Sequence, residues 1–542
     1  METKYDFIII GAGPNGLQTG AYLSKAGQKV LVLEQRYECG GGLWTEESTY
    51  PGFLHSTHAI YMMMADYAPV YKDFRLEEDY LVKHIHPELV FAMPFSDGKC
   101  LCVYKDVERT CQSIAQFSQK DAESYRKFYA LCKRCVDEFI AGATYVPPMG
   151  ALDQIVRLQQ TEVGQILMEY SEKQAIEIID EIFENDRVKT LFLYLGTHWG
   201  VKYDQNGLGY LVLLYLNRAH NYQIVKGGSH MVPQALNKII HENSGLVKNN
   251  QRVKRIIVEG GAAKGVEMEE GVVYEARKAV ISSIDPEQTF LELIDEKQLD
   301  EEFVRKIKGW QWESYSLLGV HSALEERPKF RAAVSNPDID KALVYILGYE
   351  KLDDLIGYLD ALYAGEIPKQ MGFNCCFPSN HDPNLAPPGR CVSLISAMMP
   401  YRLKEGGPEQ WYNLKFKEGL ADKCLGVLER YAPNITKDKV FQTYISTPVD
   451  IGNKFLDMRE GSIKQGAYTP FQMGYLRPSE ECSHNRTPVK NLYLAGACCY
   501  PGGCVIWGSG YLCTQHVAED YGIEKWWKEP EIVTKLKESG MA

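Results

Sequence analysis

The chain has 542 residues, of which 45% are apolar and 24% are charged, the proportions of an ordinary globular protein. These proportions exclude disorder along the whole chain, a collagen-like repeat and a coiled-coil rod. The chain holds 59 lysines and arginines against 71 aspartates and glutamates, which gives a net charge of −12. Because an acidic surface repels phosphate backbones, we expect no nucleic acid among its partners.

The cysteines and the apolar stretches indicate the cellular compartment of the protein. The longest uninterrupted apolar stretch, Leu208 to Leu216, is about half as long as a membrane-spanning helix. No charged leader with an apolar core opens the chain, so we expect no signal peptide. The 15 cysteines are odd in number and scattered, which favours reduced thiols over a disulfide framework. We therefore expect a cytoplasmic protein.

Two other features have competing interpretations. Cys132 and Cys135 are spaced like metal ligands, but they continue a helical apolar pattern within residues 118–140, so we expect both in a helix core and no metal site. In the tail, Trp526 and Trp527 stand among alternating charges. This tail is either a docked terminal helix or an interfacial helix that makes a peripheral membrane contact.

The N-terminus has the pattern of a nucleotide-binding βαβ unit. Phe7 to Ile10 predicts a buried strand, which runs into Gly11-Ala12-Gly13-Pro14-Asn15-Gly16. A helical pattern follows over residues 17–26, and residues 29–33 predict a second strand that ends in Glu34. This order of a strand, a glycine turn, a helix and a second strand that ends in an acidic residue predicts a dinucleotide-binding site.

Each residue of this motif has a physical role. Gly11 permits the tight turn, Gly13 lets a pyrophosphate approach the backbone, and Gly16 lets the helix pack closely on the strands. The helix N-terminus offers unpaired N–H groups to the phosphates. Glu34 can accept hydrogen bonds from ribose hydroxyls and would repel a 2′-phosphate, which disfavours NADP.

Two further glycine turns indicate which dinucleotide binds. Six residues after Glu34 comes Gly40-Gly41-Gly42, a second close backbone approach that suits the longer FAD molecule and is not needed for NAD. Near the other end, a strand over residues 491–496 is followed by Pro501-Gly502-Gly503 and a helical stretch. Backbone N–H groups of this turn could face the pyrimidine edge of a flavin, where negative charge develops on reduction.

These motifs together resemble the phytoene-desaturase-like flavoproteins, which include carotenoid desaturases, carotenoid isomerases and retinol saturases. The resemblance spans nearly the whole chain and is greatest to the subgroup called pyridine nucleotide-disulphide oxidoreductase domain-containing. It rests on GxGxxG with Glu34, the run from Gly41 to Thr45, Lys226-Gly227-Gly228, and LYLAG followed by PGG. A disulfide reductase would have two cysteines where Cys39 stands alone, so we reject thiol–disulfide chemistry.

The resemblance implies an α/β protein: a split Rossmann-type, amine-oxidase-like FAD-binding domain with an inserted α+β substrate domain. We expect residues 1–74, 221–289 and 441–525 in the FAD-binding domain, 75–220 and 290–440 in the substrate domain, and 526–542 in a tail. It also implies that the backbone of Val253 contacts the adenine. The expected FAD-binding residues are Gly11, Gly13, Pro14, Asn15, Gly16, Glu34, Gln35, Gly41, Gly42, Leu43, Trp44, Thr45, Val253, Gly496, Ala497, Gly503, Cys504 and Val505.

Four residues are candidates for catalysis. Tyr500 stands where the family has the histidine of His-Pro-Gly-Gly-Gly, and Arg477 lies in the run before the last strand. A phenol in this place is a proton donor at neutral pH, with a reference pKa of ~10. His58 and His198 could act as acids or bases, although a single histidine is more often structural.

We interpret the chain as a FAD-dependent desaturase, dehydrogenase or saturase that transfers a hydride between flavin N5 and an apolar, isoprenoid-like substrate. It has one dinucleotide motif, so we expect a diffusible electron acceptor: a quinone, oxygen or a partner protein. Three alternatives stay open: a redox-neutral isomerase that uses reduced FAD, an amine or amino-acid oxidase, and a non-catalytic interaction protein stabilised by FAD.

Overall fold

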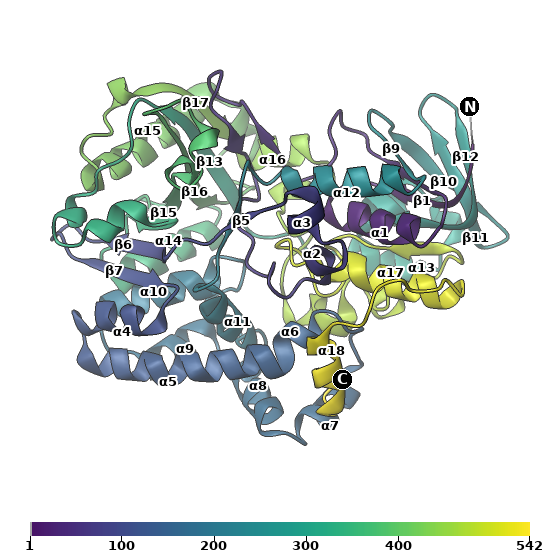
Figure 1. Cartoon of the computed structure of the whole chain (residues 1–542), viewed down its shortest axis with the longest axis horizontal. Coiled ribbons are helices and arrows are strands. Elements are labelled where there is room, and N and C mark those ends of the chain that lie inside the picture. The colour runs from purple at the N-terminus through teal and green to yellow at the C-terminus, as the bar shows by residue number, and fades with distance from the viewer. Residues whose placement is uncertain (1–2) are drawn as a thin grey trace.

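The computed structural model describes residues 3–542 and contains two seven-stranded sheets (Figure 1). The strands of the first sheet come from residues 4–33, 246–282 and 492–494, and those of the second sheet come from residues 89–104 and 316–446. Within the described residues, none of the helices is long and apolar enough to cross a bilayer.

The first sheet has the order β10-β11-β12-β1-β2-β9, with β18 paired to β12. Its central strands are parallel, and Ile10 of β1 lies beside Leu33 of β2 and Ser282 of β12. The carboxyl ends of these strands therefore meet at one edge. The strands are β1 (Lys4–Ile10), β2 (Val30–Leu33), β9 (Leu246–Lys248), β10 (Val253–Glu259), β11 (Ala262–Met268), β12 (Val273–Ser282) and β18 (Leu492–Leu494).

Three helices from distant parts of the chain pack together on this sheet. Helix α1 (Pro14–Lys25) contacts both α12 (Met231–Glu242) and α17 (Gly508–Asp520), and Figure 1 shows the three side by side. The predicted N-terminal βαβ unit is confirmed by β1, α1 and β2. The strand residues Phe7 to Ile9 are fully buried, as expected for a strand covered on both faces.

The second sheet has the order β17-β13-β16-β15-β14-β6-β7. Its neighbours are antiparallel except for β14 and β6, whose register places Val344 beside Phe91. The strands are β6 (Leu89–Pro94), β7 (Cys100–Tyr104), β13 (Ser316–Leu324), β14 (Val344–Leu347), β15 (Phe373–Cys376), β16 (Cys391–Met399) and β17 (Val440–Ser446).

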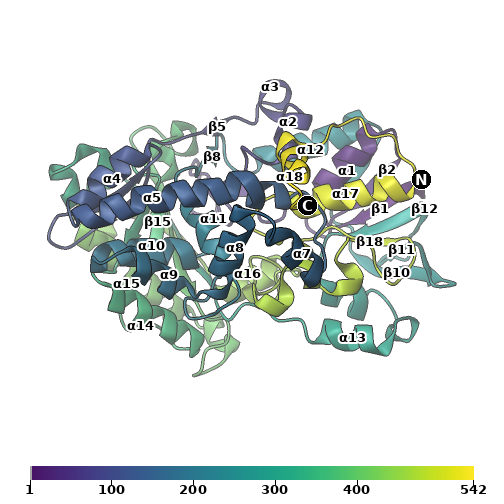
Figure 2. The same cartoon turned by 90° about the horizontal axis from the view of Figure 1, so that it is seen from below.

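A helical layer lies beside the second sheet, and Figure 2 shows the long α5 crossing this half of the molecule. Cys132 and Cys135 are fully buried on α5, as predicted for core residues. The helices of the layer are α4 (Val107–Ala115), α5 (Gln119–Cys135), α8 (Glu162–Glu172), α9 (Ala175–Ile182), α10 (Asp186–Thr197) and α11 (Tyr210–Arg218).

Two segments near the predicted domain boundaries pack in the other half. Strand β17 pairs with β13 in the second sheet, although a boundary at 441 assigns it to the FAD-binding domain. Helix α13 (Glu301–Lys308) packs through Phe303 on Phe290, in the core of the first sheet. A hydrophobic pattern can indicate that a segment is a strand or a helix, but it does not indicate which sheet the segment packs on. The sequence therefore could not assign these two segments to a domain. The domain division as a whole stays a prediction.

The C-terminal tail is docked on the body of the protein. Trp527 is buried, and Trp526 stacks on Tyr22 of α1 with ring centroids 5.5 Å apart. Helix α18 (Glu531–Glu538) contacts α6 (Ala141–Ala143). The docked alternative is thus the observed one, and a peripheral membrane contact stays a prediction.

Candidate functional site

A cavity of about 430 Å³ runs from the carboxyl edge of the first sheet to the second sheet. At one end its walls are the turns after β1, β2 and β12 and the start of β10. Further along they are the turn over residues 502–507, and at the inner end they are side chains of the second sheet and the helical layer. Residues from both sheets therefore form one site.

The turn after β1 has the geometry that a pyrophosphate requires. Gly11 has a φ of +90°, and a Cβ on Gly16 would lie 2.2 Å from the Gly11 carbonyl oxygen, so neither position accepts a side chain. A Cβ on Gly13 would meet no described atom within 4 Å, because Gly13 faces the cavity. Gly13 is also the N-cap of α1 and caps no N–H with a side chain, which leaves donors for a phosphate.

Glu34 is held at the end of β2 by two backbone donors. Ala12 N donates to Oε2 at 2.9 Å and Arg36 N donates to Oε1 at 3.0 Å. Burial raises the pKa of this carboxyl, and the two N–H groups oppose that effect. Each carboxylate oxygen can accept a second hydrogen bond, so a ribose hydroxyl remains a suitable partner.

The second glycine turn packs directly on the first. Gly40 N donates to the Ala12 carbonyl at 2.7 Å, and a Cβ on Gly41 would lie 3.2 Å from the Cα of Gly13. Gly41 and Gly42 line the cavity together with Pro14, Asn15, Gly16, Glu34, Gln35 and Val253.

Three predicted FAD-binding residues lie behind the second glycine turn and do not line the cavity. Leu43 is fully buried. The Thr45 hydroxyl pairs with the Ser56 hydroxyl at 3.0 Å and packs on Gly228, where a Cβ would lie 2.5 Å from Thr45 Oγ1. Trp44 meets the His230 ring edge-on, with centroids 6.2 Å apart. These residues shape the turn from behind.

The C-terminal turn faces the cavity in a strained conformation. Ala497, Gly503, Cys504 and Val505 line the cavity, whereas Gly496 packs against the Ser283 carbonyl behind it. Cys504 and Val505 have φ of +66° and +54°, in the left-handed region that side chains rarely adopt. Such strain costs about 1–3 kcal/mol per residue and persists only where the surroundings impose it.

Tyrosine hydroxyls and one arginine hold this turn in place. Tyr145 donates to the Ile506 carbonyl at 2.9 Å, and Gly503 N donates to the Tyr468 hydroxyl at 3.0 Å. The Tyr500 hydroxyl donates to the Ala143 carbonyl at 2.7 Å. Arg477 is fully buried and donates to the carbonyls of Ala497, Lys464 and Gln472.

The four catalytic candidates separate into two pairs. Tyr500 and Arg477 support the turn and do not line the cavity, and burial raises the pKa of the Tyr500 phenol. His58 and His198 do line it. Burial lowers the pKa of each imidazole to about 3, aided by Lys454 and Arg36 at His58 and by Lys464 at His198. Both histidines are therefore neutral at physiological pH.

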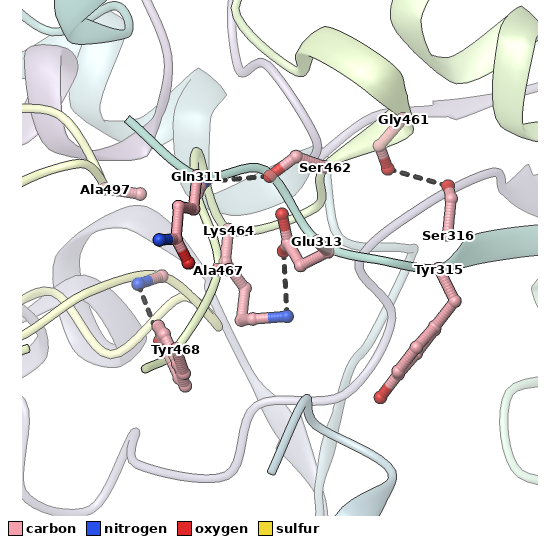
Figure 3. Close-up of polar contacts among 12 residues, drawn as sticks. Gln311, Glu313, Tyr315, Ser316, Gly461, Ser462, Lys464, Ala467, Tyr468 and Ala497 are labelled. Atoms are coloured by element: carbon pink, nitrogen blue, oxygen red, sulfur yellow. Dashed lines mark hydrogen bonds and ion pairs between the residues drawn. The ribbon is translucent and has the colours of Figure 1, made fainter. Parts of the chain in front are cut away.

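A buried ion pair behind the C-terminal turn was not predicted. Lys464 Nζ lies 2.8 Å from a carboxylate oxygen of Glu313, and the two side chains are only 2% and 5% exposed. Figure 3 shows the two side chains pointing toward one another. Burial alone would raise the pKa of Glu313, but Lys464 brings it below its ordinary value. A Cβ on Gly503 would lie 2.9 Å from the Cα of Lys464, so the pair supports the turn that faces the cavity. The partners are far apart in sequence and carry no motif.

The inner end of the cavity is also made of residues that the motifs do not include. Apolar and aromatic side chains form its walls, and Asn374 donates to both Tyr194 Oη (2.9 Å) and His198 Nε2 (3.1 Å). The apolar and aromatic lining residues are Ile60, Tyr61, Met63, Trp199, Leu317 and Leu394.

Comparison with known proteins identifies the family. Residues 16–506 match the family described as flavin containing amine oxidoreductase. The chain belongs to this family. Its members bind a flavin, and the open space at Gly13, the uncapped start of α1 and the buried Glu34 fit FAD, which is the cofactor of this protein.

Several relatives match over most of their length. A limonene dehydrogenase subunit of Castellaniella defragrans is 37% identical, covering 99% of this chain and 98% of the relative. Pyridine nucleotide-disulfide oxidoreductase domain-containing protein 2 of Mus musculus is 28% identical, covering 96% and 94%. The lycopene-forming phytoene desaturase of Pseudescherichia vulneris is 24% identical, covering 91% and 95%. The resemblance seen in the sequence is confirmed, and the protein is a FAD-dependent oxidoreductase.

A solved structure shows the same fold. Wild-type putrescine oxidase bound to putrescine superposes with a TM-score of 0.59 at 14% identity, covering 96% of this chain and 99% of that one. The predicted amine-oxidase-like fold class is thus confirmed.

Proposed function

We propose that this protein is a FAD-dependent dehydrogenase that introduces a C–C double bond into a small apolar, isoprenoid-like hydrocarbon. The observation that carries this proposal is the contrast in charge along the cavity. Among the described lining residues, the carboxylates are Glu34, Glu269, Glu292 and Asp457.

All four carboxylates belong to the nucleotide end. Glu269 pairs with Arg252 beside Val253, Glu292 pairs with Arg459, and Asp457 is close enough to Glu34 to raise the pKa of that carboxyl. The inner end offers neutral imidazoles, the uncharged amide of Asn374, aromatic rings and aliphatic side chains. An ammonium substrate would lose its hydration there without gaining an anion, whereas a hydrocarbon would gain from burial.

The dehydrogenation requires two groups to leave the substrate. When bound, FAD supplies the hydride acceptor. The turn over residues 502–505, with the glycine turns at 11–16 and 40–42, would hold the cofactor. Loss of a hydride makes the neighbouring C–H strongly acidic, so a weak base is sufficient to take the proton. The neutral imidazoles of His58 and His198 line the cavity and can serve as that base.

The aromatic inner end also excludes water, which protects an electron-deficient substrate from hydrolytic side reactions. The relative named as a limonene dehydrogenase supports a substrate of this class. The chain has one dinucleotide turn, so we infer that electrons leave the flavin to a quinone, oxygen or a partner protein.

Product identification tests the proposal. The protein is incubated without oxygen with monocyclic and acyclic ten-carbon isoprenoid hydrocarbons, and the products are analysed by mass spectrometry. We expect bleaching of the flavin and a product two mass units lighter than its substrate. An isomer of unchanged mass with no net flavin reduction would instead identify a redox-neutral isomerase, and the proposal would be wrong.

A further inference from the structure

The inner end of the cavity is closed by a wall with a small void behind it. The void has a volume of about 10 Å³. Tyr61, His198, Trp199 and Asn374 face both the void and the main cavity. A site of this size is at the lower limit for one water molecule, and its remaining walls are mainly aromatic and aliphatic. The void is therefore apolar space that the wall separates from the cavity.

Tyr222 organises this wall from behind. Its ring lies 5.5 Å from the ring of Tyr61 and 5.0 Å from the ring of Phe91, and its hydroxyl accepts a hydrogen bond from Trp199 Nε1. Ring packing and this hydrogen bond fix the two aromatic side chains, Tyr61 and Trp199, that face the cavity.

The far side of the void rests on the second sheet. Phe91 of β6 and Val344 of β14 are register partners, and both line the void but not the main cavity. Both are almost fully buried. Replacing either by a smaller residue would enlarge the void without touching the nucleotide end.

We propose that this aromatic wall sets the maximum length of the substrate, with Phe91, Tyr222 and Val344 as the residues that determine it. The inference rests on the proposed function, since it assumes that the inner end takes an apolar molecule. Each methylene that enters apolar space should tighten binding about fourfold. The increase should stop where the substrate reaches Tyr61 and Trp199, because a close-packed wall does not yield to a longer chain.

The test measures binding and does not depend on turnover. Saturated cyclohexanes with alkyl chains of increasing length are titrated into the FAD-loaded protein, and binding is followed by the change in the flavin absorption spectrum. For the wild type, we expect affinity to rise about fourfold per carbon and then to stop rising at a defined length.

Val344→Ala should move this limit by one or two carbons. Phe91→Leu is a second variant, which shortens the side chain behind the wall and should shift the limit in the same direction. Val103→Ala is the matched control: Val103 is the register partner of Phe91 on β7, is fully buried and lines neither space. We expect it to keep the wild-type limit.

The outcomes separate the two proposals. An unchanged limit in both Val344→Ala and Phe91→Leu, with FAD still bound, would overturn the role of the wall, as would an equal shift in Val103→Ala. If the limit shifts as expected but no hydrocarbon reduces the flavin, the role of the wall is supported and the proposed function is wrong.

Discussion

The two ends of the cavity recognise their ligands by different physical means. At the nucleotide end, the uncapped start of α1, glycines without side chains and the carboxyl group of Glu34 face the cavity, so we expect recognition there to be polar and to depend on the path of the backbone. At the inner end, Tyr61, Trp199 and Leu394 face the cavity, so we expect recognition there to depend on side-chain volume. The nucleotide end is therefore suited to one cofactor. At the inner end, we expect a few substitutions to change which substrate fits.

The two ends also treat charge in opposite ways. At the nucleotide end, some charged groups pair near the surface, as Arg252 does with Glu269, whereas the buried Glu34 is held by backbone N–H groups. Behind the C-terminal turn, the buried charges of Lys464 and Glu313 neutralise each other, the buried guanidinium of Arg477 is held by backbone carbonyls, and His198 stays uncharged. Loss of either partner of that pair would leave an uncompensated buried charge beside the turn.

The largest expected effect comes from breaking the pair. Lys464→Met keeps most of the side-chain volume but leaves the Glu313 carboxylate buried without a partner. Removing one partner of a buried ion pair costs about 3–5 kcal/mol, which urea unfolding would measure. The double variant Lys464→Met/Glu313→Gln should regain much of this stability. A single variant as stable as the wild type would contradict the account of the neutral end.

The polar end can be disrupted without disturbing the fold. Gly13→Val places a side chain in open space that the pyrophosphate needs, so we expect FAD affinity to fall by about a hundredfold, or about 3 kcal/mol. Gly357→Val is the matched control, because a Cβ there also meets no described atom within 4 Å and Gly357 lies away from the cavity. Fluorescence titration of FAD measures both. Equal affinities would show that Gly13 does not face the pyrophosphate.

The neutrality of His198 has a consequence for pH. Its pKa is about 3 in the folded protein and near 6.5 when unfolded, so the unfolded state binds the proton first. The stabilising effect is complete above pH 6.5 and declines by about 1.4 kcal/mol per unit as pH falls towards 3. Between pH 7.5 and 5.5, His198→Gln should lose about 1 kcal/mol less than the wild type in urea unfolding. Parallel losses would mean that His198 takes up a proton as readily in the folded protein as in the unfolded chain.

The smallest expected effect concerns the turn between the two ends. Tyr500→Phe removes the hydrogen bond to the Ala143 carbonyl, so we expect a loss of about 1 kcal/mol in stability. FAD content should stay normal, and the rate of flavin reduction should change by less than about threefold. A much slower reduction at normal FAD content would return Tyr500 to the catalytic role that the sequence suggested.

The sequence predicted the polar end far better than the inner end, for a physical reason. Gly11, Gly13, Gly16 and Glu34 lie within about one βαβ unit, and their spacing is set by a single local turn. Tyr61, Trp199 and Asn374 come from distant segments, and nothing in the spacing of such residues shows that they converge. The sequence motifs associated Tyr500 and Arg477 with the C-terminal turn. They could not show that both side chains support this turn from behind and do not face the cavity.

The most direct test of the neutral inner end compares two reductants of equal size. The anaerobic FAD-loaded protein is mixed in a stopped-flow instrument with a monocyclic ten-carbon isoprenoid hydrocarbon or with a primary amine on the same carbon skeleton, and flavin bleaching is recorded. The account predicts saturable bleaching by the hydrocarbon and none by the amine at pH 7. Rapid bleaching by the amine, with the hydrocarbon inert, would contradict it.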